Sequence, residues 1–140
     1  MPQDVIFAPM GALALLTFFV LMLIPVVRFR ASFTGKVGPG DFKYGESGNV
    51  PGEVAVPNRN FMNLLELPVL FYVVCLMFYV THRVDGLILA TASVYAGLRV
   101  IHTVIHITYN HVFHRLTFFV LSNFAVIALW VLFFLPPLRR

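Results

Sequence analysis

Residues 59–80 read RNFMNLLELPVLFYVVCLMFYV, a nearly unbroken apolar run with polar side chains gathered at its head. A run of this length covers the ~20 residues that a helix needs to cross the ~30 Å hydrocarbon core of a bilayer. Its apolar residues are continuous and do not alternate with polar ones, which favours a helix over a strand. The stretch therefore predicts a membrane-spanning helix.

The composition of the whole chain agrees with this stretch. Of its 140 residues, 59% are hydrophobic and 11% are charged, and the mean hydropathy is +0.86. A soluble domain carries roughly 25% charged residues, and a disordered chain is poor in apolar residues, so both classes are excluded. The net charge of +4 comes from basic residues that mostly flank the apolar runs, which indicates membrane topology and no nucleic-acid partner.

Three further apolar runs complete the pattern. We expect an all-α integral membrane protein whose four transmembrane helices form a bundle, at about residues 5–27, 60–81, 86–108 and 115–135, in a single domain of residues 1–140. Residues 28–58 are rich in glycine and proline, which predicts a polar loop. Lys and Arg are more frequent in the first and third loops than on the opposite side. We therefore expect a cytoplasmic 28–58 loop and a location in the inner or plasma membrane.

Polar residues at the head of the second run share one helical face. Arg59, Asn63 and Glu66 have the spacing i, i+4, i+7, which aligns them along a helix. Pro68 follows within the same run. Because proline has no backbone N–H, it predicts a kink in this helix.

The third run carries a second polar stripe. Its members are Tyr95, Arg99, His102, His106, Tyr109 and Asn110, separated mostly by three or four residues. The residues between them are apolar, so the polar side chains lie on one face of the helix. The interior of a helix bundle is the environment in which both stripes avoid contact with lipid.

Charge suggests a partnership between the two stripes. Glu66 is the only carboxylate within the predicted spans, and Arg99 is the only arginine deep in one. A lone charge in a membrane is costly, and pairing lowers the cost. We expect Glu66 and Arg99 to approach each other, within one subunit or across an interface. The pair is either a structural clamp or part of a polar pocket that also draws on Arg59, Asn63, His102 and Arg115.

The histidines allow a second interpretation. His102 and His106 lie four residues apart on one helix, a spacing suited to a divalent metal ion. The chain has five histidines and no HExxH pattern. We expect His102 and His106 to be hydrogen-bonding members of the stripe and expect no metal. A metal-dependent membrane enzyme that uses His102, His106, His111 and His114 remains an alternative.

The motifs together resemble the MAPEG superfamily, the membrane-associated proteins in eicosanoid and glutathione metabolism. One motif is Arg59-x-x-x-Asn63-x-x-Glu66 followed by Pro68. Another is Arg99-x-x-His102-x-x-x-His106, and the last is Arg115 at the head of the fourth span. Four spans with a polar first loop and a short second connection also fit, so the resemblance covers nearly the whole chain.

The resemblance implies a homotrimer of four-helix subunits that binds glutathione, as a co-substrate, between neighbouring subunits. Carried over by position, the glutathione contacts are Arg59, Asn63, Glu66, Arg99, His102 and His106. His102 and His106 stand where catalytic members tend to carry tyrosine. Arg115 matches the catalytic arginine that stabilises the glutathione thiolate. An apolar co-substrate is expected to arrive from the lipid.

Two further classes of function stay open beside the metal enzyme. The first is a membrane glutathione S-transferase or peroxidase that acts on a lipophilic electrophile. The other is a non-enzymatic trimeric membrane protein that binds a lipid or a partner and uses its polar stripes as structural ties. The response of function to loss of Arg115, compared with loss of Glu66, separates these two classes.

Overall fold

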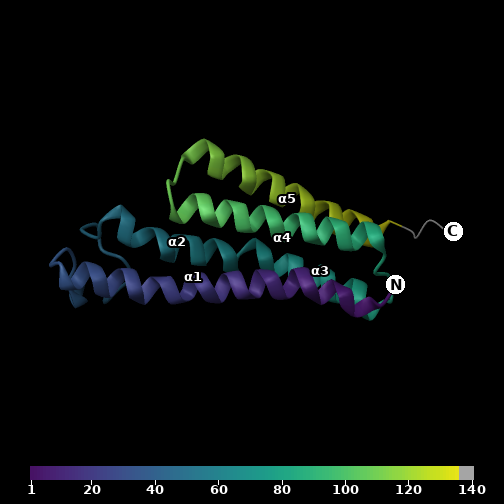
Figure 1. Ribbon diagram of the computed structural model, residues 1–140, viewed down its shortest axis with the longest axis horizontal. Coiled ribbons are helices and arrows are strands. Elements are labelled where there is room, and N and C mark those ends of the chain that lie inside the picture. Colours follow the sequence, from purple (N-terminus) through teal and green to yellow (C-terminus); the bar gives the residue numbers. More distant parts are fainter. Residues whose placement is uncertain (136–140) are drawn as a thin grey trace.

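The computed structural model describes residues 1–135, and this part of the chain is helical, without a β-sheet (Figure 1). The elements in order are η1 (Gln3–Ile6), α1 (Phe7–Phe33), η2 (Pro39–Phe42), α2 (Gly52–Leu65), α3 (Leu67–Val80), α4 (Gly86–Ile107) and α5 (Val112–Phe134). Four helical segments are long and apolar enough to cross a membrane: η1 with α1, α2 with α3, α4, and α5. The predicted all-α bundle of four membrane-spanning helices is confirmed.

The outer surface of the bundle is apolar, as lipid contact requires. Phe18, Phe19, Met22, Phe124 and Ile127 are among the large hydrophobic side chains that remain exposed along the spans. Helices satisfy all of their interior backbone hydrogen bonds within themselves, so they tolerate this environment. The protein is therefore an integral, multi-pass membrane protein.

The first loop is shorter than predicted. The sequence places it at residues 28–58, whereas α1 continues to Phe33 and α2 begins at Gly52. Hydropathy identifies only the part of a helix that lies in hydrocarbon, and both helices extend beyond it. There they bury Ala31 and Val54 against Val37 in a small cluster of their own.

The last helix begins earlier than predicted, at Val112 and not at residue 115. His111 occupies the position before the helix, and its ring nitrogen Nδ1 accepts a hydrogen bond from the backbone N–H of His114. Capping of this kind supplies a partner to an N–H that the helix leaves free. Histidine is an unusual cap, which is why the boundary is hard to find in the sequence.

The main core joins all four spans. Leu13 of α1, Phe71 and Phe78 of α3, and Leu129 of α5 are fully or almost fully buried in it. The ring of Phe71 stacks on Tyr95 of α4 with 4.4 Å between centroids. The end of α1 and the start of α2 project beyond this core and beyond α4 and α5 (Figure 1).

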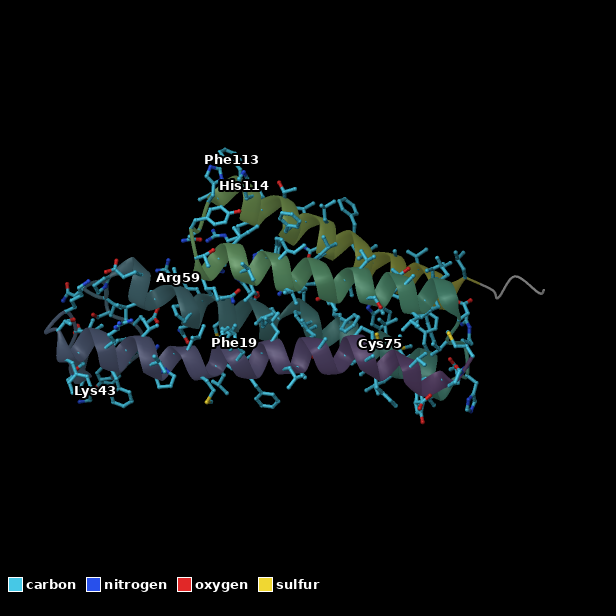
Figure 2. All side chains as sticks on the ribbon, viewed as in Figure 1. Phe19, Lys43, Arg59, Cys75, Phe113 and His114 are labelled. Carbon is cyan, nitrogen blue, oxygen red and sulfur yellow. The ribbon has the colours of Figure 1, made fainter. Side chains whose placement is uncertain are left out.

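The two ends of the bundle differ in character. At one end, Gln3 exchanges hydrogen bonds with the backbone of Val84 in the turn between α3 and α4. The opposite end holds residues 34–51 and the turn between α4 and α5 (Figure 1). Lys43 and Arg59 lie toward that second end, while Cys75 lies toward the first (Figure 2). The first and third loops therefore share one end, as the sequence predicts.

Arg83 joins the α3–α4 turn to the end of α5. Its guanidinium donates to the carbonyl oxygens of Phe133 at 2.7 Å, Leu135 at 3.1 Å and Leu132 at 3.3 Å. The last carbonyls of a helix have no partner within the helix, and a cation there also opposes the negative end of the helix dipole. Arg83 thus caps α5 from a different segment of the chain.

The carboxylate of Asp41 makes two hydrogen bonds within the first loop. Asp41 accepts from the backbone N–H of Gly38 at 2.8 Å and from the hydroxyl of Ser47 at 2.7 Å. The hydrogen bond from Gly38 and then that from Ser47 hold the pKa of the Asp41 carboxyl below its ordinary value of 3.8. The ionised carboxylate is the form that accepts both bonds.

We expect Arg83→Ala to lower the free energy of unfolding in detergent by about 2 kcal/mol, because hydrogen bonds to a charged donor each contribute roughly 1.5–3 kcal/mol. Arg30, an exposed arginine of α1, provides the matched control. Arg30→Ala should leave the unfolding free energy within about 0.5 kcal/mol of wild type. Equal losses from both variants would show that Arg83 does not act as a cap.

Acid should release the loop only at unusually low pH. The folded-state pKa of Asp41 is depressed, so the stabilisation is complete above the ordinary pKa of 3.8 and is lost as the pH falls through the folded value. The amide resonance of Gly38, followed by NMR in detergent micelles, should titrate with a midpoint below 3.8. A midpoint at or above the ordinary value would contradict the role of Asp41.

Candidate functional site

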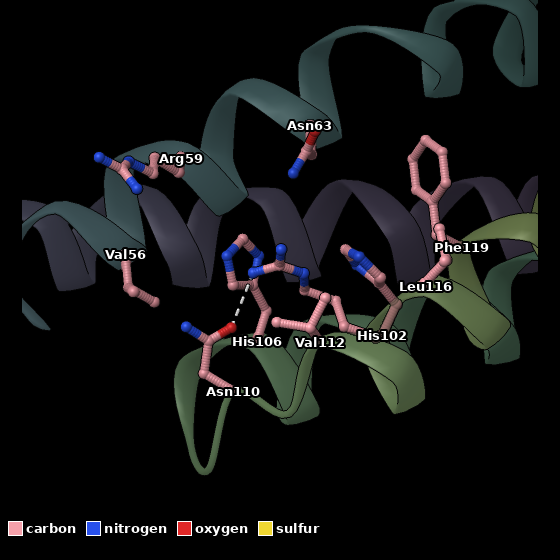
Figure 3. A pocket seen from close by; sticks show the side chains of 10 residues that line it. Val56, Arg59, Asn63, His102, His106, Asn110, Val112, Leu116 and Phe119 are labelled. Atoms are coloured by element: carbon pink, nitrogen blue, oxygen red, sulfur yellow. Dashed lines mark hydrogen bonds between the residues drawn. The ribbon is translucent and has the colours of Figure 1, made fainter. Parts of the chain in front are cut away.

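A cavity of about 340 Å³ lies between α2, α4 and α5, toward the end of the bundle that holds the first loop (Figure 3). Asn63 and the two histidines face one another across it, with Arg59 toward one end and Phe119 toward the other. The full lining is Val56, Arg59, Asn63, His102, His106, Asn110, Val112, Arg115, Leu116 and Phe119. The volume falls in the range of roughly 300–1,000 Å³ typical of small-molecule sites.

Five of the predicted site residues line this cavity: Arg59, Asn63, His102, His106 and Arg115. They come from three different helices, so the fold brings together positions that are up to 56 residues apart in sequence, as the numbers 59 and 115 show. The other two predicted residues, Glu66 and Arg99, do not line it.

The two polar stripes are buried to different extents. Tyr95, Arg99, His102 and His106 on α4 are all buried in the bundle interior, as predicted. The predicted stripe ends there, because α4 stops at Ile107 and Tyr109 and Asn110 lie beyond it, with Tyr109 exposed. The stripe on α2 differs from the prediction, because Arg59 and Glu66 are exposed and Asn63 is half-buried. The buried face of α2 is formed by other residues, including Asn60 and Leu64. The Arg59–Glu66 stripe therefore lies at the edge of the bundle interior.

Arg99 does not pair with Glu66 within the chain. Ion pairs within residues 1–135 are Arg28–Glu46 and Lys36–Glu53, both near the first loop. The Arg99 side chain is completely buried, and its Nη2 donates to the backbone carbonyl of Asn63. Its Nε and Nη1 have no partner within residues 1–135. The predicted approach of Glu66 and Arg99 across a subunit interface stays a prediction.

Pro68 accounts for the carbonyl that Arg99 binds. The second span is interrupted at Glu66, between α2 and α3, as Pro68 predicts. Pro68 has no N–H to offer the carbonyl of Leu64, four residues earlier, and at the break the carbonyl of Asn63 loses the N–H of Leu67. Asn63 belongs to that last turn. Arg99 therefore replaces a backbone donor in a place where water is scarce.

Arg115 lies in the first turn of α5, at the edge of the cavity. Its Nη1 donates to Oδ1 of Asn110 at 2.8 Å, the bond drawn in Figure 3. Asn110 has a positive φ of 46°, a left-handed conformation that asparagine adopts more readily than most residues. The dipole of α5 adds positive potential at this end. Arg115 is thus an oriented cation in a site that favours anions.

His106 and His102 form the floor of the cavity on α4. Their rings meet edge to face with 5.7 Å between centroids. Nδ1 of His106 lies 3.3 Å from Oδ1 of Asn60, which is fully buried on α2. In residues 1–135 no group of three His, Cys, Asp or Glu side chains is placed to hold a metal ion. The metal-enzyme alternative therefore gains no support from these residues.

Asn60 is not among the predicted site residues, although a signal for it exists. It follows Pro57 by three residues and precedes Leu64 by four, so it shares the helical face that α2 buries. A polar side chain on a buried face requires a hydrogen-bonding partner. That requirement points from Asn60 to the histidine and threonine of the facing helix.

The fold and the cavity define a small four-span membrane protein with a cavity lined by two arginines at one end of the bundle. The chain belongs to the MAPEG family, whose family model matches residues 6–135. No curated protein and no solved structure matches the chain. Membership associates the protein with glutathione-related chemistry at the level of the family.

The partnership between Arg99 and the break in the second span predicts coupling between two substitutions. Arg99→Leu should cost more unfolding free energy in the wild-type chain than in Pro68→Ala, where a continuous helix supplies a backbone donor to Asn63. We expect a coupling energy of about 1–3 kcal/mol, the cost of one unsatisfied buried group. Unfolding of all four proteins in mixed detergent micelles measures this energy.

Any intrinsic effect of removing a buried arginine is equal in both backgrounds and cancels in the cycle. A coupling energy near zero would contradict the role of the Asn63 carbonyl. A loss from Glu66→Gln as large as that from Arg99→Leu would indicate an ion pair between subunits instead.

Proposed function

We propose that the protein is a membrane glutathione S-transferase or peroxidase that joins glutathione to a lipophilic electrophile, and that the cavity between α2, α4 and α5 is its glutathione site. The observation that carries the proposal is the charge of the lining. Arg59 and Arg115 line the cavity, and no carboxylate is present among the lining residues. Glutathione has two carboxylates and a thiol that ionises, so a doubly cationic cavity complements it.

The arginines supply two kinds of interaction. A guanidinium binds a carboxylate through two parallel hydrogen bonds, which suits Arg59 for one end of the tripeptide. A cation beside a thiol favours the nucleophilic thiolate, which suits Arg115 for the sulfur. Asn63 offers an amide between them. We assign Arg115 the catalytic role and Arg59, Asn63, His102 and His106 roles in binding.

The apolar part of the lining suits the second substrate. Val112, Leu116 and Phe119 of α5 contribute apolar side chains to the same cavity. Val112 and Leu116 are also exposed on the outer surface of the bundle, where lipid lies. A lipophilic electrophile can therefore pass from the membrane to the thiolate along α5 without entering water.

The exposure of Glu66 is an argument for assembly of several subunits. It is exposed at the break in a membrane-spanning segment, and a carboxylate facing lipid costs about 2.5 kcal/mol or more. Packing of a second copy against this surface removes the carboxylate from lipid. We infer a homotrimer in which Glu66 faces a neighbouring subunit, receives the amine of glutathione there, and lies within reach of a buried Arg99.

The cavity lies at the same end as the first loop, and the distribution of Lys and Arg favours a cytoplasmic location for that loop. The cytosol contains the glutathione pool. An inner or plasma membrane location with this loop on the cytoplasmic side gives the site direct access to its co-substrate.

Arg115→Ala tests the proposal directly. The wild-type protein should form glutathione thiolate at neutral pH, visible by its ultraviolet absorbance. The variant should show at least a tenfold lower thiolate fraction, because an adjacent cation shifts an acid by about one to three pKa units. Glutathione at about 100 times its dissociation constant should stabilise the wild-type protein by about 2.7 kcal/mol in thermal unfolding.

Lys43→Gln removes a positive charge from the first loop, outside the cavity, and should leave both readouts unchanged. Absence of a thiolate signal and of stabilisation in the wild-type protein would refute glutathione chemistry. Intact biological function in Arg115→Ala, with assembly lost in Glu66→Ala, would instead favour a non-enzymatic binding protein.

A further inference from the structure

Below the cavity, one hydrogen bond fixes the orientation of a histidine. His106 is 3% exposed and lines the cavity from α4. Nδ1 of its ring lies 3.3 Å from Oδ1 of Asn60 on α2. The same oxygen accepts from the hydroxyl of Thr103 at 3.5 Å. Asn60 has no exposed surface, so its amide is held in the interface between the two helices.

This bond also determines which ring nitrogen of His106 carries the proton. The amide of Asn60 is oriented with Oδ1 toward the ring, and an amide oxygen only accepts hydrogen bonds, so in this orientation Nδ1 of His106 is the donor. In a neutral imidazole the other nitrogen, Nε2, then keeps a free lone pair. Nε2 makes no hydrogen bond within residues 1–135 and is not among the fully enclosed nitrogens. The lone pair is therefore available from the cavity.

We propose that His106 is the general base that removes the thiol proton of glutathione, and that Asn60 is the positioning residue that holds its ring in the reactive tautomer. This inference rests on the proposed function of the cavity and adds a residue-specific step to it. The arrangement has the three parts of an activated nucleophile: a thiol, a base, and a third group that orients the base.

Eliminating the other lining residues as candidate bases also leads to Nε2 of His106. Arg59 and Arg115 stay protonated and cannot accept a proton, and the side-chain amides of Asn63 and Asn110 are not bases. His102 is the other histidine of the lining. Its Nδ1 is buried without a partner in residues 1–135, so no side chain there fixes its tautomer. His106 is the base whose lone pair the structure directs.

The chemical step balances with the groups named. The S–H bond of glutathione breaks, an Nε2–H bond forms on His106, and the electron pair stays on sulfur beside Arg115. With a chlorodinitrobenzene as electrophile, sulfur forms a bond to the ring carbon, the carbon–chlorine bond breaks and chloride leaves. The imidazolium then returns its proton to water. Arg115 stabilises the anion, while His106 receives the proton.

The number of protons released on binding distinguishes this step from ionisation by Arg115 alone. When His106 keeps the proton, glutathione binds as a thiolate with nearly no proton released to the buffer. When no base is present, each thiolate formed releases one proton. Titration calorimetry of the wild-type protein with glutathione, in two buffers of different ionisation enthalpy, gives this number directly.

Two substitutions test the residues. His106→Gln should keep the glutathione dissociation constant within about threefold and lower kcat by about 10²-fold or more. Asn60→Leu should lower kcat with little change in KM for glutathione, and Asn60→Asp, which keeps the accepting oxygen, should restore most of the rate. His82→Asn changes an exposed histidine at the opposite end of the bundle and should behave as wild type.

The outcomes distinguish failure of the proposed glutathione function from failure of the proposed role of His106. Failure of the wild-type protein to bind glutathione would refute the proposed function and this inference with it. Glutathione bound as thiolate with one proton released would overturn this inference and leave the proposed function standing. The same holds if His106→Gln retains the wild-type kcat. Since the proton count needs no variant, a variant that fails to fold does not block the test.

Discussion

The structure depends on one constraint, that a backbone carbonyl inside a membrane needs a donor. Pro68 cannot donate to the carbonyl of Leu64, and the second span breaks into α2 and α3 at Glu66, where the carbonyl of Asn63 also loses the N–H of Leu67. A fully buried arginine on α4 then binds the released carbonyl of Asn63. The contact holds α2 against α4 next to Asn63, which lines the cavity. The relative position of these two cavity walls therefore depends on the hydrogen bond that Arg99 makes at the helix break.

The same constraint explains how charge is distributed over the molecule. Charges at the ends of the bundle are held by ordinary short contacts, such as Arg28 with Glu46 at 3.1 Å. Within the spans a charge persists where it satisfies backbone or side-chain oxygens, as Arg99 and Arg115 do. Glu66 has no such contact within residues 1–135. Its exposure within a membrane-spanning segment is the observation from which the proposed assembly of several copies is argued.

The sequence predicts the four spans because a run of about 20 consecutive apolar residues is long enough to cross a bilayer and is rare in chains that fold in water. It also predicts the buried face of α4, since a polar stripe at helical spacing must turn inward in lipid. It does not predict the lengths of α1 and α2, because a hydropathy profile does not identify the polar parts of a helix that extend beyond the apolar run. Asn60 is missed for another reason: its importance comes from His106, a residue 46 positions away on a facing helix.

The partner of Arg99 shows a limit of arguments from charge alone. Sequence offers Glu66 as the opposite charge, but a carbonyl made available by Pro68 is a competing acceptor that no count of charges reveals. Backbone acceptors become visible only when a helix break is placed in three dimensions. The break itself is readable from Pro68, so the two observations together, and neither alone, point to the observed contact.

Arg83 holds the C-terminal end of α5 by hydrogen bonds, whereas the N-terminal end of α5 diverges from α4 (Figure 1). No residue of α5 before Ser122 is buried, so the first half of this helix has only light packing. Its 23 residues span about 34 Å at 1.5 Å per residue. A tilt of about 5° around the fastened end moves the opposite end by ~3 Å over that length. A rotation of α5 about its end at Arg83 would therefore change the width of the cavity, which lies at the opposite end of the helix.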